Sequence, residues 1–213
     1  LNFLRQQAFS QPRSLGKKNF PIRQQTSPPY PEHLMWTQGS TLFVSLNIPG
    51  SNNDLLNPKS RKTSTKKAKQ LLKARDQAID AWLSEAEALF ERDSTRPTET
   101  VIAIQGNPID GSGGTSTNPS RNGYAVFMTR LVKYIDTTQR PVLLAHGDTH
   151  RFKWDKPSLK QFGGTPSSDA LFYRVEGWGH PFMNAWVQVK VKQGSATPFE
   201  ASSVSLPSPT ADN

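Results

Sequence analysis

The spacing of apolar residues divides the chain into short strands and longer helices. Apolar runs predict buried strands at 41–47, 100–104 and 142–145, because strands covered on both faces are nearly continuous hydrophobic segments. A stripe of apolar residues that recurs every 3.6 positions predicts a long helix over 64–92 and a shorter helix over 124–134. Strands that alternate with helices predict an α/β fold, in which ligands bind at the carboxyl ends of the strands.

Weaker patterns precede the first strong strand. Residues 1–9 fit the last turns of a helix, with apolar residues spaced for one face. Residues 10–33 are rich in proline and polar residues, and they predict an ordered loop or an extended connector. A short strand is expected at 34–38, and the turn at Gln38-Gly39-Ser40 predicts that it forms a hairpin with the strand that follows.

The C-terminal part of the chain alternates between apolar and polar residues. This period of two predicts strands at 171–176 and 185–192, with an antiparallel pair at the end of the domain. One domain is therefore expected over 1–204. Residues 205–213 are rich in proline and serine and are expected to form a loosely held tail.

The strand at 142–145 leads into the densest group of candidate functional residues. His146, Asp148 and His150 alternate around a glycine, so imidazole and carboxylate groups gather at one strand end. Such groups are typical metal ligands and acid–base catalysts. Two interpretations are open: a metal-dependent active site, or a polar turn whose side chains only satisfy backbone groups. His33, far from this group in sequence, is expected at the surface.

Composition excludes several kinds of site. The chain has no cysteine, which rules out disulfides, thiolate zinc sites and cysteine nucleophiles. Hydrophobic residues make up 34% of the chain. No apolar run approaches the ~20 residues of a membrane helix, so no membrane span is expected.

The chain is basic, but the excess of positive charge is local. Lys and Arg number 26 against 17 Asp and Glu, which gives a formal net charge of +9. Eight of these basic residues lie within 59–75, before the first acidic residue that follows them. A solvated helix start and a docking patch both fit this run. Nucleic acid is not the expected partner, because no aromatic residues are interleaved with these charges.

Taken in order, the predicted elements resemble the C-terminal part of the calcineurin-like metallophosphoesterases. In that family a helix with a Trp-Leu pair precedes a strand that ends in a metal-binding His, and a later strand ends in Gly-His-x-His. The corresponding segments here are Trp82-Leu83, Gln105 to Pro108 and Gly147 to His150. A bacterial subgroup is especially similar, because it shares the Gly-Ser-Asn-Asn loop, here 50–53, and the His-Gly-Asp-x-His strand end. Leu46-Asn47 also resembles the family's Leu-Asp position after a strand.

The resemblance implies an α/β fold of the metallophosphoesterase kind, an αββα sandwich with mixed sheets, incomplete at its N-terminus. Gln and Asp stand at two positions where the family has His. An oxygen-preferring cation such as Mg²⁺, Mn²⁺ or Ca²⁺ is therefore expected rather than Zn²⁺. The implied site residues are Gln105, Asp148 and His150 for the metal, His146 and His150 for catalysis, and Asn52 and Asn53 for the substrate.

The family's first three metal motifs are absent from the chain: Asp-x-His, Gly-Asp-x-x-Asp and Gly-Asn-His-Asp/Glu. Half of a ligand set cannot clamp two metals around a phosphoryl group. The hypothesis is therefore a phosphate-ester hydrolase whose N-terminal half comes from a companion fragment of the same precursor. A secreted or periplasmic location is expected. The alternative is a catalytically degenerate, phosphatase-fold binding or surface protein.

Overall fold

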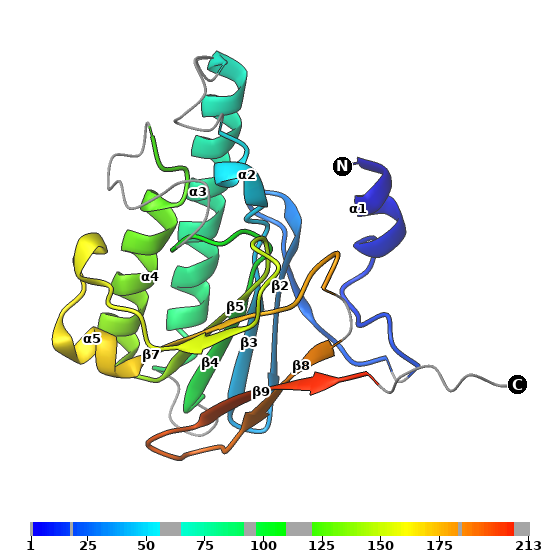
Figure 1. Ribbon diagram of the computed structural model, residues 1–213. Helices are drawn as coiled ribbons and strands as arrows, with labels where there is room; N and C mark the ends of the chain where they lie inside the picture. Colours follow the sequence, from blue (N-terminus) through cyan, green and yellow to red (C-terminus); the bar gives the residue numbers. More distant parts are fainter. Residues whose placement is uncertain are drawn as a thin grey trace, which may run out of the picture.

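A seven-stranded mixed sheet forms the centre of the computed structural model (Figure 1). Its strand order is β1-β2-β3-β4-β5-β7-β6, and helices pack on it, so the predicted α/β class is confirmed. Within the described residues, no helix combines the length and apolar content that crossing a membrane requires. The structure describes residues 2–17, 19–55, 65–91, 97–109, 121–182 and 185–206.

Parallel strands occupy the middle of the sheet, and antiparallel strands extend it at both edges. The parallel strands are β3 (Thr41–Ser45), β4 (Glu99–Ala103), β5 (Val142–His146) and β7 (Phe172–Glu176). The antiparallel strands are β1 (Arg23–Gln25), β2 (Tyr30–Gln38) and β6 (Lys153–Asp155). Consequently, the carboxyl ends of four neighbouring strands meet at one edge.

Two long helices, α3 (Lys66–Glu87) and α4 (Ala125–Thr138), cover one face of the sheet (Figure 1). Trp82 of α3 and Phe127 and Tyr134 of α4 are fully buried in this core. Burying a large apolar side chain contributes about 1.5–3 kcal/mol, so these positions hold the layer together. The shorter helical elements are α1 (Asn2–Ala8), α2 (Gly50–Asn53), η1 (Lys160–Phe162) and α5 (Pro166–Leu171).

A small antiparallel sheet of β8 (Ala185–Val191) and β9 (Phe199–Ser205) packs on the opposite face. Val187, Val189 and Phe199 join Leu143 and Tyr173 of the large sheet in a second apolar cluster. The predicted terminal antiparallel pair therefore exists, but β9 is the partner of β8. The predicted strand at 171–176 instead enters the large sheet as β7, parallel to β5.

The helix and tail boundaries differ modestly from those expected. Helix α3 begins after Thr65, whose hydroxyl accepts a hydrogen bond from the Ala68 amide at 3.1 Å and so caps the helix. It ends at Glu87, before the predicted limit of 92, and α4 continues past 134 to Thr138. Strand β9 reaches Ser205, and most of the predicted tail, 207–213, lies outside the described residues.

His33 lies on β2 and is fully buried, so the expectation of a surface position is wrong. Its Nδ1 lies 2.7 Å from Gln25 Oε1, while Gln25 Nε2 donates to the Ala78 carbonyl at 2.7 Å. The amide oxygen must accept, so Nδ1 carries a proton. Nε2 is buried without a hydrogen-bond partner among the described residues, which favours the neutral tautomer. Desolvation by burial lowers the pKa of His33 to about 4.

The burial of His33 predicts a specific acid sensitivity. Its folded-state pKa of about 4 lies below the ordinary value of 6.5, so the unfolded chain binds the proton more readily. His33 therefore contributes stability that is present above pH 6.5 and lost as the pH falls towards 4. Between pH 7 and pH 4.5 the loss reaches about 2–3 kcal/mol.

Urea denaturation of wild type and His33→Gln across this pH range measures the effect. The wild type is expected to lose about 2–3 kcal/mol more than the variant, since other titrating groups are common to both proteins. Parallel pH profiles for the two proteins would contradict the assignment of a neutral, buried imidazole.

Candidate functional site

The candidate site lies where the parallel strands end. Main-chain hydrogen bonds continue past the strands and hold these ends together: the Gly147 amide donates to the Gln105 carbonyl at 3.2 Å, and the Gly177 amide donates to the His146 carbonyl at 2.9 Å. The segments after β3, β4, β5 and β7 therefore form one continuous rim. This is the position at which α/β sheets bind ligands.

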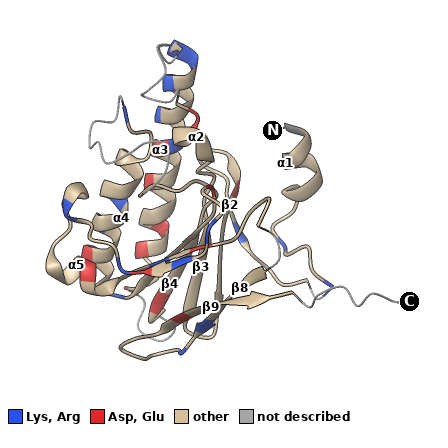
Figure 2. Ribbon diagram, in the orientation of Figure 1, with Lys and Arg blue, Asp and Glu red and all other residues tan. Residues whose placement is uncertain are grey.

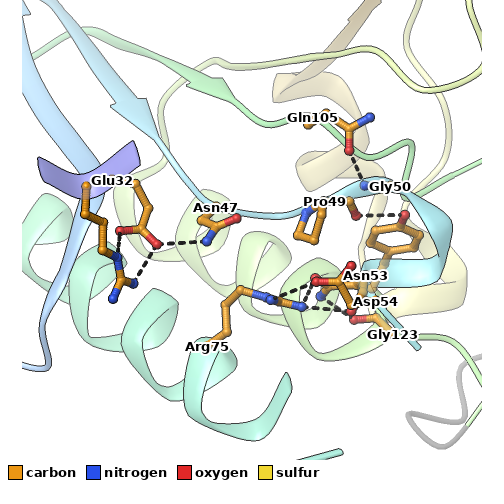
Figure 3. A network of polar contacts seen from close by, with 11 residues as sticks. Glu32, Asn47, Pro49, Gly50, Asn53, Asp54, Arg75, Gln105 and Gly123 are labelled. Carbon is orange, nitrogen blue, oxygen red and sulfur yellow. Dashed lines mark hydrogen bonds and ion pairs between the residues drawn. The ribbon is translucent and has the colours of Figure 1, made fainter. Parts of the chain in front are cut away.

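Gln105 and Asp148 converge on Gly50, which follows β3. Gln105 Oε1 accepts a hydrogen bond from the Gly50 amide (Figure 3). A Cβ atom at Gly50 would lie 2.4 Å from Asp148 Oδ1 and 3.0 Å from Gln105 Oε1, so only glycine allows this approach. The structure thus brings together two of the three predicted metal ligands, one from the end of β4 and one from the end of β5.

His150 lies on the outer side of the same turn. Its side chain is exposed and packs on Gly179, where a Cβ atom would come within 2.7 Å of His150 Cδ2. Both Asp148 (φ 85°) and His150 (φ 63°) have left-handed backbone conformations, so the turn folds back sharply. Among the described residues, no group of three or more His, Cys, Asp or Glu side chains is arranged to hold a metal ion.

His146, the other predicted catalytic residue, ends strand β5 and points into the protein. It is only 6% exposed, and its Nδ1 lies 2.9 Å from the Gly147 carbonyl oxygen. On the sheet it is paired with Glu176 of β7. The structure therefore places it beneath the rim, whereas His150 is on the solvent side.

Asn52 and Asn53 belong to an unusual turn rather than to an open anion site. Residues 51–54 have φ angles of 54°, 60°, 55° and 62°, so this "left-handed turn" is four residues long. Each such residue costs about 1–2 kcal/mol, although Asn and Asp tolerate the conformation best. Both asparagine side chains are fully buried, and they hydrogen-bond to the main chain of Arg121 and Gly123. Their side-chain amides thus stabilise the turn through hydrogen bonds within the protein.

Arg75 of α3 fastens this turn (Figure 3). Its Nη2 donates to the carbonyl and side-chain oxygens of Asn53 at 2.8 and 2.7 Å, and its Nη1 lies 3.3 Å from Asp54 Oδ2. Asn47, at the start of the same segment, donates to Glu32 at 2.9 Å, and Glu32 binds Arg5 of α1. The segment after β3 is therefore fixed from two sides.

Sequence reasoning missed a buried carboxylate at the rim. Glu176, the last residue of β7, is fully buried and accepts a hydrogen bond from the Thr149 amide at 2.9 Å and another from the Thr149 hydroxyl. The side-chain amide of Asn107 also donates to Glu176 at 3.2 Å. The main-chain amide of Asn107 donates to Asp148 Oδ2, also at 3.2 Å. One feature of the sequence could have pointed to Glu176: it stands at the carboxyl end of a predicted strand, where ligand sites of α/β folds lie.

Comparison with known protein families, with curated proteins and with solved structures found no match.

The Arg75 contacts predict a large effect of a single substitution. Arg75→Met keeps the aliphatic stem but removes the buried, charge-assisted hydrogen bonds that hold the left-handed turn. The free energy of unfolding should fall by about 2–4 kcal/mol. The exposed Lys67→Met on the same helix should change it by less than about 0.5 kcal/mol.

Urea denaturation measures both losses, and hydrogen exchange of the Gly123 amide, which donates to Asn52 Oδ1, reports on the turn directly. Similar stability losses in the two variants, with unchanged Gly123 exchange, would show that Arg75 does not hold the turn.

Proposed function

We propose that the chain contributes the C-terminal half of a divalent-cation-dependent phosphoesterase site, located at the carboxyl ends of β4 and β5. The observation that carries the proposal is the convergence of Gln105 Oε1 and Asp148 Oδ1 on Gly50. An amide and a carboxylate oxygen suit hard cations such as Mg²⁺, Mn²⁺ and Ca²⁺ better than Zn²⁺.

The residues fit a cation in part. Gln105 and Asp148 would hold it, and His150, exposed on the same turn, is the proposed third ligand. Within the described part of the chain, no lysine or arginine forms an ion pair with Asp148, so no side-chain cation competes with a metal ion for this carboxylate. A bound cation would polarise a phosphoryl oxygen of a phosphate ester.

His150 and His146 have different proposed roles. As an alternative to holding the cation, the exposed imidazole of His150 could deliver a proton to a leaving oxygen at the rim. The buried His146 lies beneath the rim, beside Glu176 in the sheet register, and its proposed role is to orient the turn that carries Asp148. The inward direction of Asn52 and Asn53 leaves their assignment to the substrate without support from the geometry.

The proposal includes a companion N-terminal fragment of the same precursor. In this proposal the helices, the large sheet and the small sheet would be three of the four layers of an αββα sandwich. The apolar row that β8 and β9 cover at Val101 and Leu143 continues to Phe43 and Trp36. These two rings are stacked at 5.1 Å and half-buried, which supports a further covering segment. A secreted or periplasmic location stays a prediction.

One observation favours the alternative, a degenerate binding or surface protein. Gln105 and Asp148 already accept hydrogen bonds from the Gly50 and Asn107 amides. These bonds hold the rim together without a cation. A cation would have to compete with the Gly50 amide for Gln105 Oε1, whereas the Asn107 amide occupies Oδ2 of Asp148 and not Oδ1.

Cation binding by the purified chain separates the two proposals. Mn²⁺ should bind with a dissociation constant on the order of 10⁻⁴–10⁻³ M, the range of weak oxygen-ligand sites. Asp148→Asn should weaken binding roughly tenfold or more, and Gln105→Glu should tighten it, because ligand charge sets the affinity. Calorimetry and Mn²⁺ paramagnetic resonance measure these constants.

Glu91→Gln is the matched control, since Glu91 is an exposed carboxylate beyond the end of α3. Equal affinities for Asp148→Asn and Glu91→Gln, or no saturable binding, would favour the degenerate protein. Hydrolysis of an aryl phosphate is expected only after the chain is joined to its companion fragment, with Mn²⁺ present.

A further inference from the structure

A groove lies between α3 and α4 on the outside of the helical layer. Its volume is about 820 Å³, within the roughly 300–1,000 Å³ typical of small-molecule sites. The apolar residues that line it include Leu72 and Ile79 of α3 and Ala125, Val126 and Phe127 of α4. Val126 is 40% exposed, and the other four are buried and form the floor. The groove is therefore large enough and apolar enough to hold an alkyl chain.

Most of the charged residues along the edge of the groove are basic. Lys69 and Lys73 stand near the N-terminal end of α3, where Figure 2 shows several basic residues along the ribbon, and Lys133 stands on α4. Within the described residues none of these three lysines forms an ion pair. Arg130 is different, because it binds Asp80, Ser84 and Glu87 and its charge is compensated there.

Two acidic residues line the groove, Asp76 and Asp80, and Asp80 is paired with Arg130. Asp76 has no such partner in the described part of the chain. It is half-buried, and its Oδ1 has no hydrogen-bond partner among the described residues. Desolvation by burial raises the pKa of Asp76 to about 7, and the nearby Arg75 opposes that rise. A substantial fraction of Asp76 is therefore neutral at pH 7, which leaves the three lysines as the dominant uncompensated charges.

We propose that this groove binds a medium-chain fatty carboxylate. The acyl chain lies between α3 and α4, and the carboxylate is held by Lys69 and Lys73. From Lys69 to Asp80 the groove-lining side of α3 is about 16 Å long, at about 1.5 Å of helix rise per residue. An alkylamine would meet the lysines with like charge, and an alcohol would leave them without a partner.

The proposal is independent of the phosphoesterase site. The groove is formed by the outer surfaces of α3 and α4, whereas Gln105 and Asp148 lie at the carboxyl edge of the sheet. Fatty-acid binding and cation binding can therefore be present or absent separately.

Calorimetric titration with decanoate, decylamine and decanol tests the ligand class. Decanoate, kept below its micelle concentration, should bind with one-to-one stoichiometry and at least about tenfold more tightly than decylamine, because the rim lysines attract one charge and repel the other. Chemical-shift changes should fall on α3 and α4. Decylamine binding as tightly as decanoate, shifts confined to other elements, or no saturable decanoate binding would each overturn the proposal.

Lysine variants test where the carboxylate lies. Lys73→Gln should weaken decanoate binding about 2–5-fold, the range of a partly exposed ion pair. The control Lys67→Gln removes an exposed lysine of the same helix that does not line the groove, and it should leave the affinity unchanged. Equal effects of the two substitutions would refute a specific head-group contact.

The pH dependence tests the part played by Asp76. The other charged residues that line the groove with it are Lys69, Lys73 and Asp80 on its own helix and Arg130 and Lys133 on α4, and Arg75 acts on it electrostatically. Above pH 7 Asp76 becomes a carboxylate and repels the ligand, so wild-type affinity should fall about 3–10-fold between pH 6 and pH 8. Asp76→Asn should show a flat profile. A flat wild-type profile, or a matching fall in Asp76→Asn, would overturn this part of the proposal.

Discussion

The attachment of Arg75 to the left-handed turn is the interaction on which the rest of the site depends. Four consecutive residues, 51–54, have positive φ angles, and L-residues adopt that conformation only when other contacts outweigh its cost. Arg75 of α3 provides such contacts through its hydrogen bonds to Asn53. The main chain of Gly123, just before α4, provides others through its hydrogen bonds with Asn52 and Asn53. The turn in return directs the Gly50 amide at Gln105. Helix packing thus determines the position of the rim.

The rim combines a buried carboxylate with a partly exposed one, and the difference in burial gives them different roles in the proposed site. Glu176 is enclosed, and Thr149 and Asn107 give it the hydrogen bonds that a buried charge requires. Asp148 is half-exposed and accepts a hydrogen bond from the main-chain amide of Asn107. Glu176 therefore acts as the anchor that aligns three strand ends. Asp148 retains the lone pairs and the access to solvent that a cation ligand needs.

Sequence pattern was a sound guide to the elements and to the rim, because both depend on local periodicity and strand polarity. Gln105 and Asp148 each follow the end of a parallel strand by two residues, so the neighbouring strands β4 and β5 bring them to one edge. The sequence pattern could not predict which polar residues are buried or which strands pair with one another. His33 is enclosed by α3 through Gln25 and Ala78, contacts 8 to 53 residues apart in sequence. Strand β9 is largely polar, so the partner of β8 gave no hydrophobic signal.

The structure also changes the interpretation of the basic run. Positive charge at a helix start is ordinarily solvated, and much of this run is exposed on α3. The lysines of the run differ in which side of α3 they occupy. Lys69 and Lys73 are four residues apart, so they share one side of the helix, and both line the apolar groove. Lys67 does not line it. Arg75, from the same run, turns inward and holds the left-handed turn. One short basic segment therefore carries three physical roles, and net charge alone could not distinguish them.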